Sequence, residues 1–476
     1  MKMKKVLSII LTAAILLTTA CSDNNTSSIN SQNSTVGNSS GGVTDNSTSN
    51  MVVENTPNKV DDTLPQCDPA NLPNVLNYYR QCVMEGEDGY YYTAYTTTMA
   101  LYYYDTASGR SIPLCSKPQC MHDGNDFCAA TGGGVYEMYK TLTTMYNGYI
   151  YKLGDDAQET EKWTLSLLKA DLQGNELSKV ADIVTMPLTD VIGMEPQIKS
   201  AVFHYGMLFV SVSAQKEKLE NFLYSVNLTT GEVKEINIAP PEKGTREFVP
   251  ATCSYMTADG DWLYYTVRCC KYDNTMIYGE NHMTYNRTVM YRYNIKTGKT
   301  EVISALPDVY SSFTVANDII YYTFADRSDN TFSLYSYDIT NDKTTTFADK
   351  IQQKYVNGKY IEDIQKITVI TDKKYLYVCT SGLEGSYSKE YSTETQDDID
   401  FYIYSLDGKQ LLHGMPGMDI AIDDYGYGLS AVDGELYFYF SEHINDDIDN
   451  TGLYKIKTED LINGGTEWTK LYKAIN

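Results

Sequence analysis

The stretch Asp259-Gly260-Asp261-Trp262-Leu263-Tyr264-Tyr265 joins a tight-turn signal directly to a run of aromatic and branched residues. Aspartate followed by glycine favours a hairpin turn, and the residues that come after it favour a β-strand. Related stretches begin at residues 88, 147, 205, 317, 372 and 433, so seven copies follow one another at spacings of 54 to 61 residues. A repeat of this period indicates an architecture built from identical structural units.

Each unit divides into four short strands. In the fifth unit we expect strands at residues 311–316, 319–325, 331–339 and 344–349, with polar turns between them. Tyrosine doublets such as Tyr264-Tyr265 put large rings on both faces of one strand, which fits a sheet packed between two neighbouring sheets. No stretch shows a long apolar period of 3.6 residues, so helix is expected to be incidental. The sequence therefore predicts an all-β fold, a β-propeller of seven four-stranded blades.

The repeated pattern Asp-Gly-Asp-Trp-Leu-Tyr-Tyr, followed by Leu-Tyr and by an Asp/Thr-Gly-Lys turn, resembles two related groups of proteins. These are the TolB-like propellers and the uncharacterised repeat domains of Gram-positive surface lipoproteins. The resemblance covers residues 88–471, and its motifs specify a fold. It implies no particular chemistry, because propellers include both enzymes and adaptors.

Residues 1–20 have the pattern of an export signal. Three lysines among the first five residues precede an apolar run from Val6 to Leu17, which is too short to span a bilayer. Cys21 then resembles the lipobox cysteine of bacterial lipoproteins, although Thr18 stands where that pattern usually has leucine. The resemblance implies that Cys21 carries lipid, with palmitate among the expected acyl chains. An ordinary secretory signal is the alternative.

Residues 21–63 consist of this cysteine and a segment dominated by Ser, Asn, Thr, Gly and Asp. Such a segment cannot bury enough apolar surface to offset the entropy lost on ordering, so we expect a disordered tether. A flexible chain of this length averages about 35 Å from end to end. Residues 64–476 are the predicted propeller domain. The predicted location is the extracellular face of the cytoplasmic membrane, with the lipid as the only membrane contact.

The charge narrows the choice of partners. The formal net charge is −24, and it becomes −27 once the three lysines of the signal are removed. Nucleic acid is excluded as a partner, because its binding needs basic patches. We expect a monomeric domain that binds a protein or a glycan without catalysis and without a cofactor. There is no Gly-x-Ser-x-Gly motif and the five histidines are scattered. The alternative is an extracellular carbohydrate-active enzyme with a carboxylate pair on one rim.

The segment between the first and second units is rich in sulfur. Cys115, Cys120, His122 and Cys128 fall within fourteen residues, in a segment resembling one in uncharacterised propeller lipoproteins. In an exported protein, cysteines favour disulfides. Three thiolates and an imidazole also suit tetrahedral zinc, although these spacings match no common zinc motif. The sequence therefore predicts disulfides within this cluster or to its neighbours, with zinc as the second hypothesis and free thiols as the third.

Six further cysteines lie in the mature chain: Cys67, Cys82, Cys253, Cys269, Cys270 and Cys379. A disulfide between Cys67 and Cys82 would close a 15-residue loop. Closing such a loop stabilises a protein by ~3 kcal/mol in the chain-entropy treatment. The nine thiols other than Cys21 are an odd number, so at least one is unpaired or bridges two chains.

One acidic stretch, residues 447–452, weakly resembles a calcium-binding loop. Its candidate ligands are Asp447, Asp449 and Thr451, but the twelfth position of the loop is Thr458, where such loops have glutamate. The competing interpretation is a solvated hairpin loop that binds no metal.

Overall fold

The structure is a computed structural model, and all residues that it describes belong to the compact unit Asn50–Asn476. The described residues are 53–54, 84–86, 88–95, 99–122, 128–131, 142–155, 161–175, 177–190, 196–215, 219–238, 248–272, 283–303, 313–326, 331–352, 367–380, 400–414, 427–432, 434–445 and 448–473. The predicted signal peptide, Cys21, Cys67 and Cys82 lie outside them, as does the predicted tether except for Val53 and Glu54.

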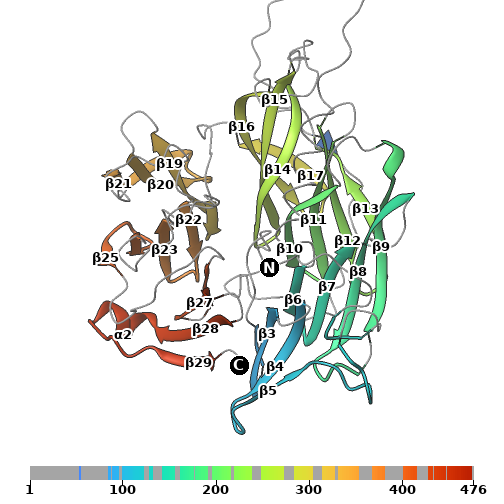
Figure 1. Cartoon of the computed structure of the whole chain (residues 1–476). Coiled ribbons are helices and arrows are strands. Elements are labelled where there is room, and N and C mark those ends of the chain that lie inside the picture. Colours follow the sequence, from blue (N-terminus) through green and yellow to red (C-terminus); the bar gives the residue numbers. More distant parts are fainter. Residues whose placement is uncertain are drawn as a thin grey trace, which may run out of the picture. The chain divides into compact units, whose positions relative to one another are not determined.

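The described strands form seven antiparallel sheets, each built on four strands that are consecutive in the chain. This is a seven-bladed β-propeller (Figure 1). The strands of blade 1 are β2 (Met84–Glu85), β3 (Gly89–Tyr95), β4 (Met99–Asp105) and β5 (Arg110–Pro113). Those of blade 2 are β6 (Leu142–Tyr146), β7 (Tyr149–Asp155), β8 (Lys162–Asp171) and β9 (Leu177–Pro187). Those of blade 3 are β10 (Gln197–His204), β11 (Met207–Gln215), β12 (Leu219–Asn227) and β13 (Val233–Ile236).

The remaining four blades follow the same order along the chain. The strands of blade 4 are β14 (Phe248–Asp259), β15 (Trp262–Tyr272), β16 (Met283–Asn294) and β17 (Lys299–Ile303). Those of blade 5 are β18 (Phe313–Ala316), β19 (Ile319–Asp326), β20 (Thr331–Asp338) and β21 (Lys343–Gln352). Those of blade 6 are β22 (Ile367–Thr371), β23 (Tyr375–Thr380), β24 (Asp400–Ser405) and β25 (Gln410–His413). Those of blade 7 are β26 (Tyr427–Val432), β27 (Glu435–Asn445), β28 (Ile448–Lys457) and β29 (Thr469–Lys473).

The predicted all-β fold of seven four-stranded blades is confirmed, with one addition. Strand β1 (Val53–Glu54) pairs with β17 and gives blade 4 a fifth strand, with Val53 opposite Thr300. These two residues come from the segment predicted to be a tether. Helix is confined to η2 (Leu188–Asp190) and α2 (Thr458–Ile462) among the described residues. No helix in this part of the chain has the length and apolar character needed to cross a bilayer.

The core is divided among the junctions between blades, and the tyrosine doublets explain how. In blade 4, Tyr264 packs toward blade 5 with Tyr322, whereas Tyr265 packs toward blade 3 with Phe209. Both rings of the doublet are fully buried. Successive residues of a strand point to opposite faces of the sheet, so a blade lying between two neighbours buries both. Among the described residues, seven such clusters account for the seven junctions of a closed ring.

The closing junction, where blade 7 meets blade 1, will be called the seam. No strand is shared across it, because the described strands of each blade are consecutive. Tyr437 of β27 packs there with Tyr90, Tyr92 and Tyr102 of blade 1. The seam is therefore held by side-chain packing and not by a β-ladder.

Hydrogen bonds also connect the first turns of successive blades, where the first turn joins the first strand to the second. In four blades, a side chain at or just before this turn bonds to the backbone of the next blade's first turn. The pairs are Tyr146 Oη accepting from Gly206 N–H at 2.9 Å, His204 Nε2–H donating to Gly260 O at 2.6 Å, Asp259 Oδ2 accepting from Asp318 N–H at 3.5 Å, and Asp372 Oδ2 accepting from Gly434 N–H at 3.2 Å.

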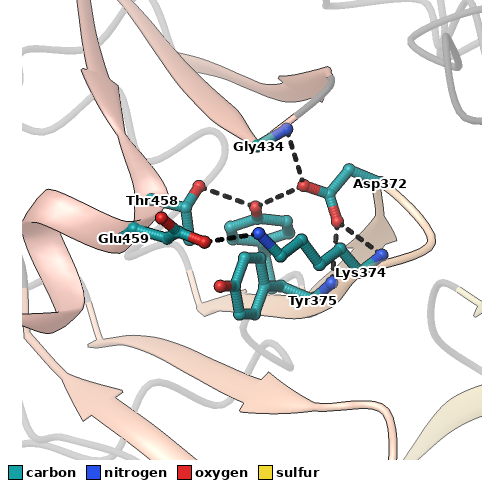
Figure 2. Close-up of polar contacts among 7 residues, drawn as sticks. Asp372, Lys374, Tyr375, Gly434, Thr458 and Glu459 are labelled. Atoms are coloured by element: carbon teal, nitrogen blue, oxygen red, sulfur yellow. Dashed lines mark hydrogen bonds and ion pairs between the residues drawn. The ribbon is translucent and has the colours of Figure 1, made fainter.

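Figure 2 shows the most extensive of these links, between blades 6 and 7. Both carboxylate oxygens of Asp372 are occupied: Oδ1 accepts from the backbone N–H groups of Lys374 and Tyr375, and Oδ2 accepts from the Tyr377 hydroxyl and from Gly434 N–H. Lys374 also pairs with Glu459 of α2 across the same junction. One aspartate thus closes its own turn and holds the next blade against it.

Candidate functional site

The cysteine segment, residues 114–131, connects blade 1 to blade 2 and is described at residues 114–122 and 128–131. Backbone hydrogen bonds fix both of its ends on strand β4, since Leu114 N–H donates to Leu101 O and Leu101 N–H donates to Ala130 O. The chain therefore leaves blade 1 and returns to the same strand residue, which brings Cys115 and Cys128 close together.

Four side chains of this segment converge on one point. The Sγ atoms of Cys115, Cys120 and Cys128 and a ring nitrogen of His122 all lie within 4.8 Å of one another. Gln119 and His122 have positive φ values of 64° and 54°, a backbone conformation that non-glycine residues adopt in only a few per cent of cases. These left-handed residues turn the short chain sharply enough for all four groups to face inward. The structure thus brings together the four residues that the sequence singled out.

The Cys128 thiol lies in surroundings that stabilise its anionic form. It is buried, and its Sγ accepts a hydrogen bond from Thr131 N–H at 3.5 Å and lies 3.2 Å from Thr131 Oγ1. The His122 Nδ1 atom is 3.8 Å away. Burial alone raises the pKa of this thiol, but the bonds from His122 and Thr131 outweigh it and lower the pKa of Cys128 to about 6.

A lysine from blade 2 completes the surroundings. Lys152 of β7 is fully buried, and its Nζ donates to Ala130 O at 2.7 Å. Burial lowers the pKa of Lys152 to about 8, and the negative charge of Cys128 works in the opposite direction. The sequence analysis missed this residue. The sequence does show a lysine in the middle of the mostly apolar strand Tyr149–Asp155. A lysine at such a position is more simply interpreted as a residue that faces solvent.

Blade 2 also holds the segment through a glycine. Ser116 N–H donates to Gly174 O at 3.1 Å, in the turn between β8 and β9. A Cβ atom on Gly174 would lie 2.8 Å from the carbonyl carbon and oxygen of Leu114 and 3.0 Å from Cys115 N, and its φ is +69°. Only glycine allows this close approach, so the position of Cys115 depends on a turn about 60 residues further along the chain.

The other predicted site residues are not brought to this cluster. Cys253 and Cys379 are buried in other junctions and, like the three cluster cysteines, form no disulfide in this structure. Burial raises the pKa of the Cys253 thiol to about 12, which makes it inert. The backbones of Cys269 and Cys270 lie on β15. The predicted Cys67–Cys82 disulfide lies outside the described residues and stays a prediction, as does disulfide pairing within the cluster.

The weak calcium candidate lies partly on a strand. Asp447 is outside the described residues, whereas the backbones of Asp449 and Thr451 belong to β28, opposite His443 and Ser441 of β27. The hairpin is therefore tighter than the sequence suggested, because pairing extends almost to its tip. The calcium hypothesis itself stays a prediction.

The described carboxylates act as hydrogen-bond acceptors in turns and ion pairs. Asp171 accepts from Asn175 N–H at 2.8 Å, and Asp182 accepts from Ser166 Oγ at 2.7 Å and pairs with Lys179. Burial raises the pKa of Asp171, but hydrogen bonds to its ionised form outweigh burial, so the pKa is lowered. Every described carboxyl group whose pKa departs clearly from its ordinary value is shifted downward: Asp105, Asp171, Asp182, Asp261, Glu301, Asp338, Asp407 and Glu459.

Polar groups from three blades also gather near the first turns. Lys373 Nζ of blade 6 pairs with Asp259 Oδ1 of blade 4 at 2.8 Å, although one blade lies between them in the chain order. His204 of blade 3 is buried beside the same turn, and burial lowers its pKa, so its imidazole is neutral near pH 7. These contacts connect the turns of different blades.

Several solved structures resemble this chain at low sequence identity. A prolyl endopeptidase structure has 10% identity and a TM-score of 0.48, over 83% of this chain and 50% of its own. The propeller domain of the trilobed protease from Pyrococcus furiosus has 11% identity and a TM-score of 0.42, over 84% of this chain and 97% of its own. The polysaccharide lyase Uly1 has 10% identity and a TM-score of 0.44, over 79% and 90%.

These similarities concern the fold and carry no activity with them. The chain spans only about half the length of the prolyl endopeptidase. No protein-family model and no curated protein matches the sequence. Strand order and packing define this chain as a seven-bladed β-propeller.

Proposed function

We propose that this chain is a non-enzymatic binding or scaffold propeller that recognises a protein or a glycan at the cell surface. Lipid on Cys21 would hold it on the extracellular face of the cytoplasmic membrane, and the segment up to residue 63 would serve mainly as a tether. The support for this location is the N-terminal pattern together with the resemblance of the repeat to TolB-like and Gram-positive lipoprotein propellers.

The observation that carries the binding function is the state of the described carboxylates. A glycoside hydrolase needs a carboxylic acid whose pKa is raised, so that it holds a proton to donate to the leaving group. Among the described residues, every carboxyl group whose pKa departs clearly from its ordinary value has a lowered pKa instead, and most of these groups close turns or pair with lysine or arginine. Among the described residues, carboxylates thus serve as structural acceptors, which favours recognition over acid–base chemistry.

The net charge of −24 points to the kind of partner. An acidic surface attracts basic protein segments and repels anionic polymers such as nucleic acid. Basic segments of other cell-surface proteins are the ligand class that suits this charge best, and neutral glycans are compatible with it.

The test measures binding and turnover on the same material. The full chain is presented to a panel of neutral and acidic polysaccharides and to basic cell-surface peptides. We expect retention by at least one of them, measured by biolayer interferometry, without release of new reducing ends or unsaturated products. Depolymerisation that is abolished when one carboxylate is replaced by its amide would contradict the proposal and establish the carbohydrate-active enzyme instead.

A further inference from the structure

We propose that Cys115, Cys120, His122 and Cys128 bind one structural Zn²⁺ ion. The ion would rigidify the segment that packs into the seam of the propeller. This inference is independent of the proposed function, because it concerns how the ring is closed and not what the ring binds.

The first argument is geometric. A tetrahedral zinc site with Zn–S bonds of about 2.3 Å places its sulfur atoms roughly 3.8 Å apart. The four ligand atoms of this cluster already lie within 4.8 Å of one another, so a small inward movement completes the coordination. The residues come from one short segment whose ends are fixed on strand β4, so the backbone around the site brings the four side chains together.

The second argument is chemical. Three thiols and one imidazole are the ligand set of closed structural zinc sites, with no position left for substrate. Zinc would bind the three cysteines as thiolates and release their protons to solvent. Such a site has a net charge of −1. Lys152 is buried beside it and supplies a compensating positive charge, and Thr131 N–H orients the Cys128 sulfur.

The third argument weighs zinc against the disulfide hypothesis. A disulfide among three cysteines leaves one sulfur over, and it does not use the His122 imidazole that lies against the sulfurs. In this structure the imidazole approaches Cys128 Sγ at 3.8 Å, in a residue held at a positive φ of 54°. Zinc uses all four side chains, whereas a disulfide uses two of them.

The fourth argument is the position of the cluster. Cys128 is fully buried in the same hydrophobic cluster as Tyr90 and Tyr92 of blade 1 and Tyr437 of blade 7, and Cys115 and Cys120 pack against it. Lys152 and Gly174 attach the same segment to blade 2. No β-ladder crosses the seam among the described strands. A metal at this point therefore cross-links a single segment that contacts blades 1, 2 and 7, at the junction that closes the ring.

The experiment measures metal content and thiol state together. The complete chain is produced in an exporting bacterial host and purified without chelator or reductant. We expect about one equivalent of zinc per chain by mass spectrometry of the metal, and three cluster thiols that react with alkylating agents only after chelation. Replacement of the zinc by Co²⁺ should give the thiolate-to-cobalt charge-transfer absorption of a tetrahedral sulfur-rich site.

The variants Cys120→Ser and His122→Ala should lose the zinc, while the matched variant His413→Ala, in blade 6, should keep it. Loss of zinc should also lower the midpoint of thermal unfolding. A peptide map of the non-reduced wild type with a disulfide between two cluster cysteines and no zinc would overturn the proposal. Zinc that is retained in both cluster variants would also overturn it. If the cluster variants do not fold, the cobalt spectrum of the wild type decides, and the absence of the charge-transfer band refutes the site.

Discussion

Replacement of Asp372 by alanine tests the idea that first-turn hydrogen bonds hold neighbouring blades together. The Asp372 side chain is only 4% exposed and accepts four hydrogen bonds. Two of the donors, Lys374 N–H and Tyr375 N–H, lie in its own turn. The other two are the Tyr377 hydroxyl and Gly434 N–H, and the latter belongs to blade 7 (Figure 2).

The expected change in the free energy of unfolding depends on whether each donor finds another hydrogen-bond partner once the carboxylate is removed. A hydrogen bond to a charged group contributes about 1.5–3 kcal/mol, and the values are not additive. The Tyr377 hydroxyl keeps Thr458 Oγ1 as a partner at 2.8 Å, and the backbone N–H of Lys374 belongs to a partly exposed turn that water can reach. The main uncompensated losses are therefore at Tyr375 and Gly434. We expect Asp372→Ala to lower the free energy of unfolding by about 3–4 kcal/mol.

The matched control is Asp338→Ala in blade 5. Asp338 also closes a turn by accepting from two backbone N–H groups, those of Thr340 and Asn341, and from the Asn341 side chain. It makes no described bond to another blade, and its turn is exposed, so we expect a loss of about 1 kcal/mol or less. Urea unfolding followed by circular dichroism compares the two variants. Equal losses for Asp372→Ala and Asp338→Ala would show that the link between blades contributes nothing, and the reasoning would be refuted.

Three other predictions rest on separate features. Gly174→Ala should lower the free energy of unfolding by about 2–4 kcal/mol, because it combines a left-handed backbone with a clash against Leu114 and Cys115. The control Gly148→Ala has the same left-handed backbone but open space around it, so it should cost about 1 kcal/mol in urea unfolding. Equal costs for the two variants would mean that the segment moves to accommodate the new methyl group. Cys21→Ala should release the protein from the membrane fraction without changing its unfolding midpoint, and incorporation of labelled fatty acid that is equal in both forms would contradict the lipid assignment. The free energy of unfolding should fall as pH rises from about 10 to about 12. Burial raises the pKa of four tyrosines to about 12, whereas in the unfolded chain they ionise near their ordinary pKa of about 10; they are Tyr293, Tyr321, Tyr322 and Tyr404. Circular dichroism and tyrosinate absorbance would show unfolding and ionisation in one step, and ionisation well before unfolding would contradict this.

The blades could be predicted from the sequence because strand and turn signals act locally. The four strands expected in the fifth unit agree with β18 to β21 to within three residues at each end. Strand β1 could not be predicted, because two residues in a polar segment carry no strand period, and only the exposed edge of β17 makes Val53–Glu54 extended. The helix Thr458–Ile462 was missed for the same reason, since five residues are too few for a helical period.

The cysteine cluster was found from the sequence, but its surroundings were not. Cys115 and Cys128 could be singled out because they fall within fourteen residues together with Cys120 and His122. Their convergence depends on contacts with Leu101, Lys152 and Gly174, which lie on other strands and turns. The links between first turns were hidden for a different reason. The linking side chain is tyrosine in blade 2, histidine in blade 3 and aspartate in blades 4 and 6, so the link is similar in role without being similar in sequence.

The strand order has a consequence for the way the chain folds. Every blade pairs strands that are neighbours in sequence, so each sheet can form as soon as its own 54 to 61 residues are available. A chain that is synthesised from its N-terminus can therefore fold blade by blade while the rest is still unfolded. Two contacts must wait: Val53 pairs with Thr300 only after blade 4 exists, and Tyr437 reaches Tyr90 only at the end. Until that last contact forms, the tyrosine-lined faces of the first and last blades are exposed to water, and this interval is when the propeller most needs protection from aggregation.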